Sequence, residues 1–205
     1  MEELLALKAL QIDALREVAN IGAGHAATAL SQMIGERIMI SVPRINVTRL
    51  EDVRPQLGPP DEPVAAVLMH MMGDLTGRTL LVFPRTTAHR IAALLLHANN
   101  GDDDFSAMEQ SAIKEAGNIL SSAYMNALSD FMGMMLIPSP PSLAVDMSSA
   151  VLTTAHLQFG NDQDLVFCVE SELLLNNIDE HLRGYFLLLP DSASLHAILK
   201  AVRVA

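Results

Sequence analysis

Apolar residues recur at a helical period in two long stretches of the chain. The first stretch runs from about Glu2 to Ile34 and ends at Gly35, a residue type common at helix C-termini. The second begins at Ser106, which precedes Glu109 with the spacing of a capping box. Its apolar positions at helical period are Met108, Ile113, Ala116 and Ile119. The pattern predicts two long helices, each with one buried face.

Shorter apolar runs, rich in Val, Leu and Ile, follow each long helix and predict strands. In the first half these runs are VAAVLMHMMG and GRTLLVFP, and in the second half they are LVFCVESELLL and GYFLLLP. Each pair leads into a helical run, TTAHRIAALLLHA in the first half and SASLHAILKAV in the second. The turns are short, which favours antiparallel pairing. With a further, first strand at Pro43 and at Pro141, each half is therefore predicted to contain a helix, three strands and a second helix.

An internal repeat relates the two halves. A shift of 98 positions places KEAGNILSSAYMNAL, residues 114–128, over REVANIGAGHAATAL, residues 16–30. The matched pairs include Glu17 with Glu115, Asn20 with Asn118, Ile21 with Ile119, Gly35 with Gly133 and Pro43 with Pro141. Neither half is large enough to close a core alone, so we expect a shared sheet. The expected fold is α/β, more narrowly α+β: one domain, residues 1–205, built from repeats at about 1–100 and 101–205. We expect pseudo-two-fold symmetry, with the long helices packed on a mainly antiparallel sheet.

The second repeat is longer than the first. Pro43 and Pro84 are 41 positions apart, whereas Pro141 and Pro190 are 49 apart, so the second half holds about eight more residues. We assign the difference to DMSSAVLTTAHL, residues 146–157, as a small helical insertion after the first strand of that half.

Composition and charge exclude several classes of protein. Half of the residues are apolar, yet the longest apolar runs are far shorter than the roughly 18 to 20 residues that cross a bilayer. The acidic N-terminal stretch has no secretory signal pattern, so we expect a cytoplasmic protein with no membrane insertion. The net charge of −11, without a Lys/Arg cluster, argues against nucleic acid as a partner.

The chain shows no pattern typical of a metal site or a nucleophile. Cys168, the single cysteine, lies in the apolar run LVFCV and is predicted to be a buried strand residue. The GDDD run at 101–104 is predicted to be a solvated loop, and the seven histidines lack metal-ligand spacing. We therefore expect no metal and no cofactor of its own. The methionines, Met132, Met134 and Met135 among them, are expected to fill the core, with a partner-binding patch as the alternative.

The run from Gly22 to Ala27 is close to a dinucleotide-binding fingerprint. That motif needs a strand before it and a helix starting at it, whereas a helical pattern precedes Gly22. The second repeat has Leu120 and Ser122 in place of the two glycines. We interpret Gly24 and Ser122 as small residues required for close packing.

The same stretch also places a carboxylate and an amide on one helix face. Glu17 and Asn20 are three residues apart, with Asp13 one turn earlier. Ser111, Glu115 and Asn118 repeat that face in the second half. Asn is a poor helix former, so its recurrence in mid-helix indicates a function rather than a propensity.

Each repeat has an Asp or Ser, then a Glu after three residues, an Asn after two more, and a Pro after a further 22. This pattern resembles the signature of the CheC, CheX and FliY family of chemotaxis phosphatases. Both copies fit, and the double motif with NIGAGHAATALS resembles the CheC type. The resemblance implies a hydrolase acting on the aspartyl phosphate of the response regulator CheY, which supplies its own bound Mg²⁺. It also implies that Glu17, Asn20, Glu115 and Asn118 are catalytic, and that Asp13 and Ser111 aid substrate docking.

Within that resemblance, the asparagines would orient the attacking water and the glutamates would pair with a lysine of the regulator. The alternative function is a non-catalytic adaptor that binds the receptor deamidase CheD. For that partner the segment from Asp146 to His156 is the candidate surface, with Asp146 as its probe. We expect a monomer. The sequence leaves open whether both sites work and which is faster.

Overall fold

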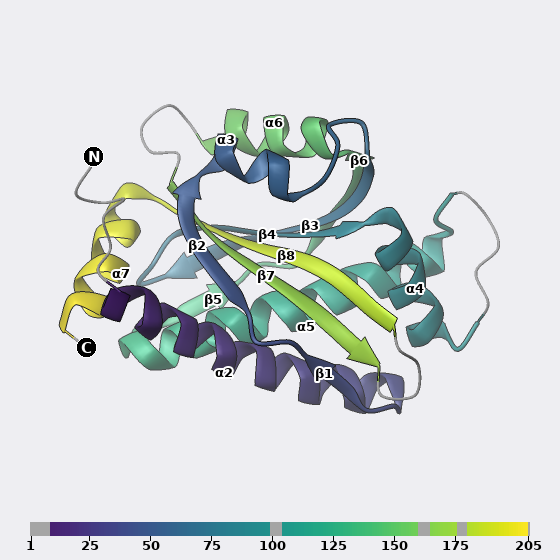
Figure 1. The fold of residues 1–205 in the computed structure, drawn as a ribbon, viewed down its shortest axis with the longest axis horizontal. Helices are drawn as coiled ribbons and strands as arrows, with labels where there is room; N and C mark the ends of the chain where they lie inside the picture. Colours follow the sequence, from purple (N-terminus) through teal and green to yellow (C-terminus); the bar gives the residue numbers. More distant parts are fainter. Residues whose placement is uncertain (1–8, 99–103, 160–164, 176–179, 205) are drawn as a thin grey trace.

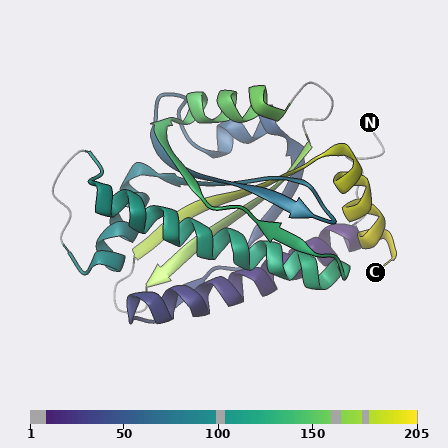
Figure 2. The same cartoon turned by 180° about the vertical axis from the view of Figure 1, so that it is seen from behind.

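The structure, a computed structural model, describes residues 9–98, 104–159, 165–175 and 180–204. It has three layers: a central sheet, the long helices on one face together with the helices at 85–96 and 192–204, and the helices at 50–56 and 148–159 on the other (Figures 1 and 2). No helix in the described ranges is long and apolar enough to span a membrane. Residues 1–8 and 101–103, which hold the start of the predicted first helix and most of the GDDD run, lie outside the described residues.

Both halves follow the predicted order, with more strands than expected. The first half contains α2 (Ala9–Ile34), β1 (Ile38–Ile40), β2 (Arg44–Arg49), α3 (Leu50–Val53), the 3-10 turn η1 (Arg54–Gln56), β3 (Pro63–Gly73), β4 (Gly77–Pro84) and α4 (Arg85–Leu96). The second half contains α5 (Ala107–Met132), β5 (Leu136–Pro138), β6 (Ser142–Met147), α6 (Ser148–Phe159), β7 (Leu165–Leu175), β8 (Glu180–Pro190) and α7 (Ser192–Val204). The predicted first strand of each half is thus divided into two.

The halves exchange strands within one antiparallel sheet. Its order is β1-β7-β8-β4-β3-β5, with β2 also paired to β7 and β6 also paired to β3. The first strands of each half therefore pair with the other half, while β4 and β8 meet in the centre. This arrangement confirms the predicted shared, antiparallel sheet.

Pro43 and Pro141 occupy the break between the two short strands of each half. Ile40 pairs with Leu173 but Arg44 pairs with Glu170, so four steps on one strand match three on the other. This is a β-bulge, and the second half repeats it between Pro138 and Ser142. Proline is tolerated there because a bulged residue leaves the hydrogen-bond ladder.

A serine two residues before each proline holds the bulge in place. The Ser41 N–H donates to the Glu172 carbonyl at 2.9 Å, and the Ser41 hydroxyl accepts from the Glu172 N–H at 3.0 Å. Ser139 makes the same two bonds with His70, both at 2.9 Å. Both repeats therefore contain the same pair of serine hydrogen bonds, which the sequence pattern did not predict.

Two apolar cores lie on opposite faces of the sheet. The larger core fills the space under the long helices and includes Leu15, Leu30, Val67, Met69, Phe83, Ile113, Leu120, Phe167, Phe186 and Ile198. The smaller core lies under α3, η1 and α6 and includes Val53, Leu57, Val82, Leu152, Cys168 and Leu187. Burial of these side chains is the main favourable contribution to folding.

Helix α5 begins and ends as its sequence predicts. The Ser106 hydroxyl accepts from the Glu109 N–H and the Glu109 carboxylate accepts from the Ser106 N–H, which confirms the capping box. Gly133 ends the helix with a φ of 62°, as Gly35 does for α2 with 76°. The assignment of Met108 to the buried face is wrong, since this side chain is 66% exposed.

Two further expectations need correction. The helical segment after the first strands is present as α6, but the first half has a shorter counterpart in α3 and η1, so the second half is not alone in having one. Among the methionines expected in the core, Met132 and Met134 pack against it but Met135 is 59% exposed.

Candidate functional site

Helix α2 carries the first predicted site on its outer face. Asp13, Glu17 and Asn20 are all exposed, while the opposite face packs Leu15, Val18 and other apolar residues against the sheet. A spacing of three to four residues brings side chains onto one face of a helix. Because the apolar face is anchored in the core, the polar face is held toward solvent. We call Asp13, Glu17 and Asn20 the α2 stripe.

Helix α5 carries the matching residues. Ser111 and Glu115 are exposed and Asn118 is half-buried; we call these three the α5 stripe. The adjacent Gly117 faces the sheet, where a Cβ atom would lie 2.6 Å from Val67 Cγ2. This close approach seats α5 directly on β3 and fixes the direction of the stripe. The structure thus places each predicted set on one exposed helix face, and the catalytic roles stay a prediction.

The two helices run side by side in opposite directions over the same sheet face (Figures 1 and 2). Gly22 lies at their contact: a Cβ atom there would be 2.8 Å from Tyr124 Cδ1 and 3.0 Å from Tyr124 Cα. Gly24 has no atom within 4 Å of its Cβ position, so the packing role predicted for Gly24 belongs to Gly22 instead. Both glycines lie inside α2 and not at a strand-to-helix turn, which rules out the dinucleotide motif.

The stripes differ in the cation beside them. On α2, Arg16 forms an ion pair with Asp13 at 2.6 Å. On α5 the equivalent residues are Lys114 and Ser111, and Lys114 has no ion-pair partner among the residues that the structure describes. The positive charge beside the α5 stripe is therefore available to a partner, whereas that beside the α2 stripe is neutralised within its own helix.

The chemistry available on each stripe is that of one carboxylate and one amide. An asparagine amide donates two hydrogen bonds and accepts two, but it does not titrate and so cannot act as a general base. Groups of three or more His, Cys, Asp or Glu able to hold a metal are absent from the described residues. Such stripes can position a water molecule and a charged group, while any nucleophile activation must come from the substrate complex.

Cys168 lies in β7 and is 1% exposed, as predicted. Its thiol donates to Gln56 Oε1 at 3.7 Å. Burial, with a smaller contribution from the charge of Glu170, raises the pKa of the Cys168 thiol to about 12. A thiol so strongly held in its neutral form is not a nucleophile at physiological pH.

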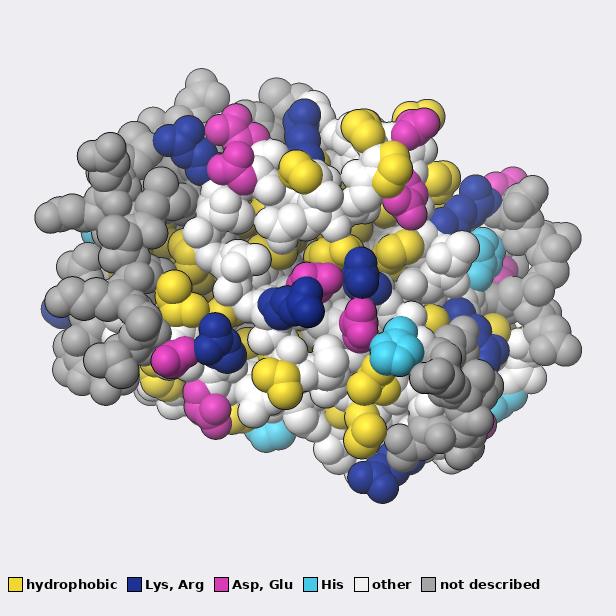
Figure 3. Space-filling view, viewed as in Figure 1, with side chains coloured by type: hydrophobic (Ala, Val, Ile, Leu, Met, Phe, Trp, Pro, Cys, Tyr) yellow, Lys and Arg dark blue, Asp and Glu magenta, His cyan; other side chains and the backbone are white. Residues whose placement is uncertain are grey.

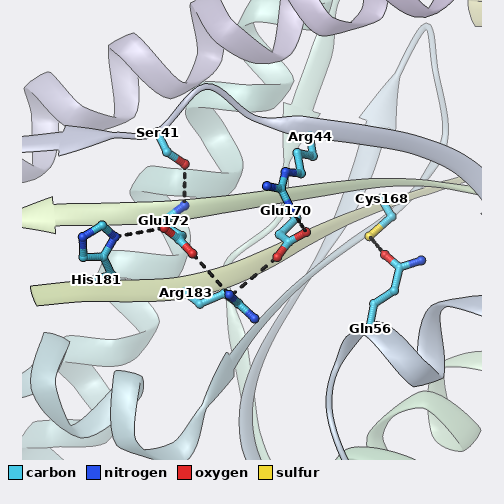
Figure 4. Close-up of polar contacts among 8 residues, drawn as sticks. All are labelled: Ser41, Arg44, Gln56, Cys168, Glu170, Glu172, His181 and Arg183. Carbon is cyan, nitrogen blue, oxygen red and sulfur yellow. Dashed lines mark hydrogen bonds and ion pairs between the residues drawn. The ribbon is translucent and has the colours of Figure 1, made fainter.

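A second polar cluster lies on the opposite face of the sheet, beyond the cover of α3 and η1 (Figures 3 and 4). Arg183 contacts both Glu170, at 3.5 Å, and Glu172, at 3.4 Å. His181 lies 3.1 Å from Glu172, and Arg44 lies 4.0 Å from Glu170. Each carboxylate is thus compensated by a cation of a neighbouring strand, which is typical of a structural network that joins β2, β7 and β8.

Asp146, the predicted probe of partner binding, is exposed on β6 at the edge of the sheet. It lines a groove of about 240 Å³ between α6 and strands β6, β3 and β4. Most of the other lining residues are apolar, including Leu68, Leu143 and Val151. The candidate partner surface therefore lies on the opposite side of the sheet from the two stripes.

These observations define a class: duplicated α/β proteins that present one Glu and one Asn on each of two antiparallel helices. The profile of the CheC-like family matches residues 10–47 and 108–145, which contain the two stripes. The CheY-P phosphatase CheC of Bacillus subtilis (strain 168) is 31% identical over 203 residues, covering 96% of this chain and 95% of that protein. The chain belongs to the CheC-like family, which confirms the resemblance found in its sequence.

Solved structures share the fold. FliY of Thermotoga maritima superposes with a TM-score of 0.77 at 21% identity, over 97% of this chain and 98% of that chain. A chain of the CheX-CheY-BeF3-Mg²⁺ complex from Borrelia burgdorferi gives a TM-score of 0.50 at 15% identity, over 82% of this chain and 95% of that chain. Both likenesses show that the α/β fold of this chain is shared.

Proposed function

We propose that this protein hydrolyses the aspartyl phosphate of the response regulator CheY, with one site on α2 and one on α5. The observation that carries the proposal is the Glu and Asn pair on a solvent-facing helix surface, present twice with the same spacing on helices anchored in one core. Family membership supports it, since the Bacillus subtilis relative is named a CheY-P phosphatase. One domain formed by both repeats would thus hold two active sites.

The substrate is phosphorylated CheY with its own bound Mg²⁺. Asn20 or Asn118 accepts a hydrogen bond from a water molecule through its carbonyl oxygen and holds that water in line with the phosphorus. The water oxygen forms the new P–O bond and the bond from phosphorus to the aspartate oxygen breaks. The regulator's aspartate carboxylate is thereby freed, and the water protons leave with the inorganic phosphate as H₂PO₄⁻. Positioning and charge stabilisation are the main sources of catalysis in phosphoryl transfer.

The remaining stripe residues bind the regulator and do not act on the water. Glu17 and Glu115 pair with a lysine of the CheY active site through a charge-assisted hydrogen bond. Asp13 and Ser111, one turn earlier, contact the docked regulator. Lys114, which forms no ion pair with any described residue, adds attraction for the phosphorylated and therefore more negative face of the substrate.

The direct test follows decay of magnesium-bound phosphorylated CheY with and without the protein. Asn20→Ala and Asn118→Ala should each lower turnover, and the double variant should lose nearly all of it, because removal of a positioning group costs on the order of 10² to 10³ in rate. Glu17→Ala and Glu115→Ala should instead raise KM. Unchanged decay of the phosphorylated regulator at saturating wild-type protein contradicts the proposal.

The matched control is Asn46→Ala. Asn46 is exposed on β2, away from both helices, so its loss should leave turnover unchanged. If the double asparagine variant keeps its fold by circular dichroism and still matches the wild type, water positioning by these amides is wrong.

A second candidate function is an adaptor that binds the receptor deamidase CheD, and the groove beside Asp146 favours it. Asp146→Lys should abolish binding of a CheD-type deamidase while phosphatase activity persists. Asp130→Lys, an exposed charge reversal on α5, is the control that should leave binding intact. If the asparagine variants abolish binding and Asp146→Lys does not, the division into two surfaces is wrong.

A further inference from the structure

The two stripes differ at the position four residues beyond each asparagine. On α5 this residue is Ser122, which is half-buried, and its hydroxyl donates to Asn118 Oδ1 at 3.5 Å. On α2 the residue is Gly24, which has no side chain to offer. Among the described residues, no side chain or backbone group makes a hydrogen bond with the amide of Asn20.

Packing does not account for this difference. The Cβ position of Gly24 is open, with nothing within 4 Å, and its φ is not in the left-handed region, so a side chain such as that of Ala or Ser fits there. Glycine in an exposed helix interior lowers stability relative to most residues. Ser122 is only half-buried, so its place in the fold does not demand a hydroxyl either.

The hydrogen bond from Ser122 favours one orientation of the Asn118 amide. The terminal torsion of an asparagine is broad, so the amide of a free side chain rotates and exchanges the places of its oxygen and nitrogen. The bond turns Oδ1 of Asn118 toward Ser122 and leaves the NH₂ group on the other side. Since a carbonyl oxygen has two lone pairs, Oδ1 still accepts a hydrogen bond from water.

We propose that Ser122 is a positioning residue that orients the amide of Asn118 before substrate binds, whereas Gly24 leaves Asn20 to be ordered by the substrate itself. The inference rests on the phosphatase function proposed above and concerns the inequivalence of its two sites. The α5 site is preorganised for water alignment. In the α2 site no other described residue holds the Asn20 amide, so a smaller fraction of substrate complexes has the water in line and kcat is lower.

The test isolates each site in the full-length protein. Asn20→Ala leaves the α5 site alone, and in that background Ser122→Ala should lower kcat about two- to fivefold, because a single neutral hydrogen bond of this length is weak. KM should change little, since Ser122 does not dock the regulator. Ser122→Thr keeps the hydroxyl and should restore kcat.

The reciprocal arm uses Asn118→Ala, which leaves the α2 site alone. Gly24→Ser in that background should raise kcat by a similar factor, about two- to fivefold. Gly24→Ala is the matched control: it adds the same Cβ and the same helix stiffness without the hydroxyl, and it should leave kcat unchanged.

The outcomes separate this inference from the proposed function. If wild-type protein does not accelerate phosphate loss, the function itself is wrong. If the wild type is active but Ser122→Ala leaves kcat unchanged in the Asn20→Ala background, Ser122 is not a positioning residue. A silent Asn20→Ala variant beside an active wild type, or equal gains from Gly24→Ser and Gly24→Ala, overturns the inference as well.

Discussion

Gly22 and Gly24 lie two residues apart on α2, and replacing each by alanine tests the contact between α2 and α5. In Gly22→Ala the new Cβ would stand 2.8 Å from Tyr124 Cδ1 and 3.0 Å from Tyr124 Cα. Tyr124 is 5% exposed and stacks on Phe186 with ring centroids 4.7 Å apart, so it has little room to yield. In Gly24→Ala the new methyl meets nothing within 4 Å.

Both substitutions gain the same helix stabilisation, but only one of them adds an unfavourable contact to the free energy of folding. Replacing a mid-helix glycine by alanine stabilises a helix by about 0.8–1.0 kcal/mol. Overpacking at a close contact costs about 1–3 kcal/mol, and only Gly22→Ala incurs that cost. We therefore expect Gly24→Ala to raise the free energy of unfolding and Gly22→Ala to lie about 1–3 kcal/mol below it.

Urea unfolding followed by circular dichroism measures both free energies, with equal m values as the check that the unfolding transition is unchanged. In thermal unfolding the separation corresponds to roughly 2 to 12 °C in Tm for a chain of this size. Equal stabilisation by the two variants would mean that α2 and α5 do not approach closely at Gly22, and the orientation of both stripes would then need revision.

Two other outcomes are expected. A hydrogen bond from His181, and then the contacts with Arg183, lower the pKa of Glu172. The ionised carboxylate therefore stabilises the fold at any pH above the ordinary glutamate pKa. This stabilisation is lost as the pH falls through the lowered pKa of Glu172. Glu172→Gln should therefore reduce Tm at pH 7 but not at a pH below that lowered pKa, and a deficit that persists in acid contradicts the ion-pair explanation. Cys168, buried with a pKa raised to about 12, should react with a thiol reagent only as fast as the protein unfolds. Rapid labelling of native protein at pH 8 would refute its burial.

Local patterns were sufficient wherever the physical cause is itself local. The capping box of Ser106 and Glu109, and the glycines that end α2 and α5, depend on residues within one turn. The two stripes were also predictable, since side chains three to four residues apart share a helix face and the repeat shows the pattern twice. Met108 was assigned wrongly because it lies in the first turn of α5. The apolar pattern extends into that turn, but the core that buries the rest of the face does not.

The sequence by itself determined the two long helices, their polar stripes, the antiparallel strands and the duplication, because periodicity and spacing along the chain encode which side of an element is buried. Only the tertiary structure decided what lies against that side. The exchange of strands between halves joins Ile38 to Leu175, a contact that no local pattern reports. Likewise Gly22 and Gly24 look alike in the sequence, and they differ because Tyr124 of the other repeat stands over one and open space over the other.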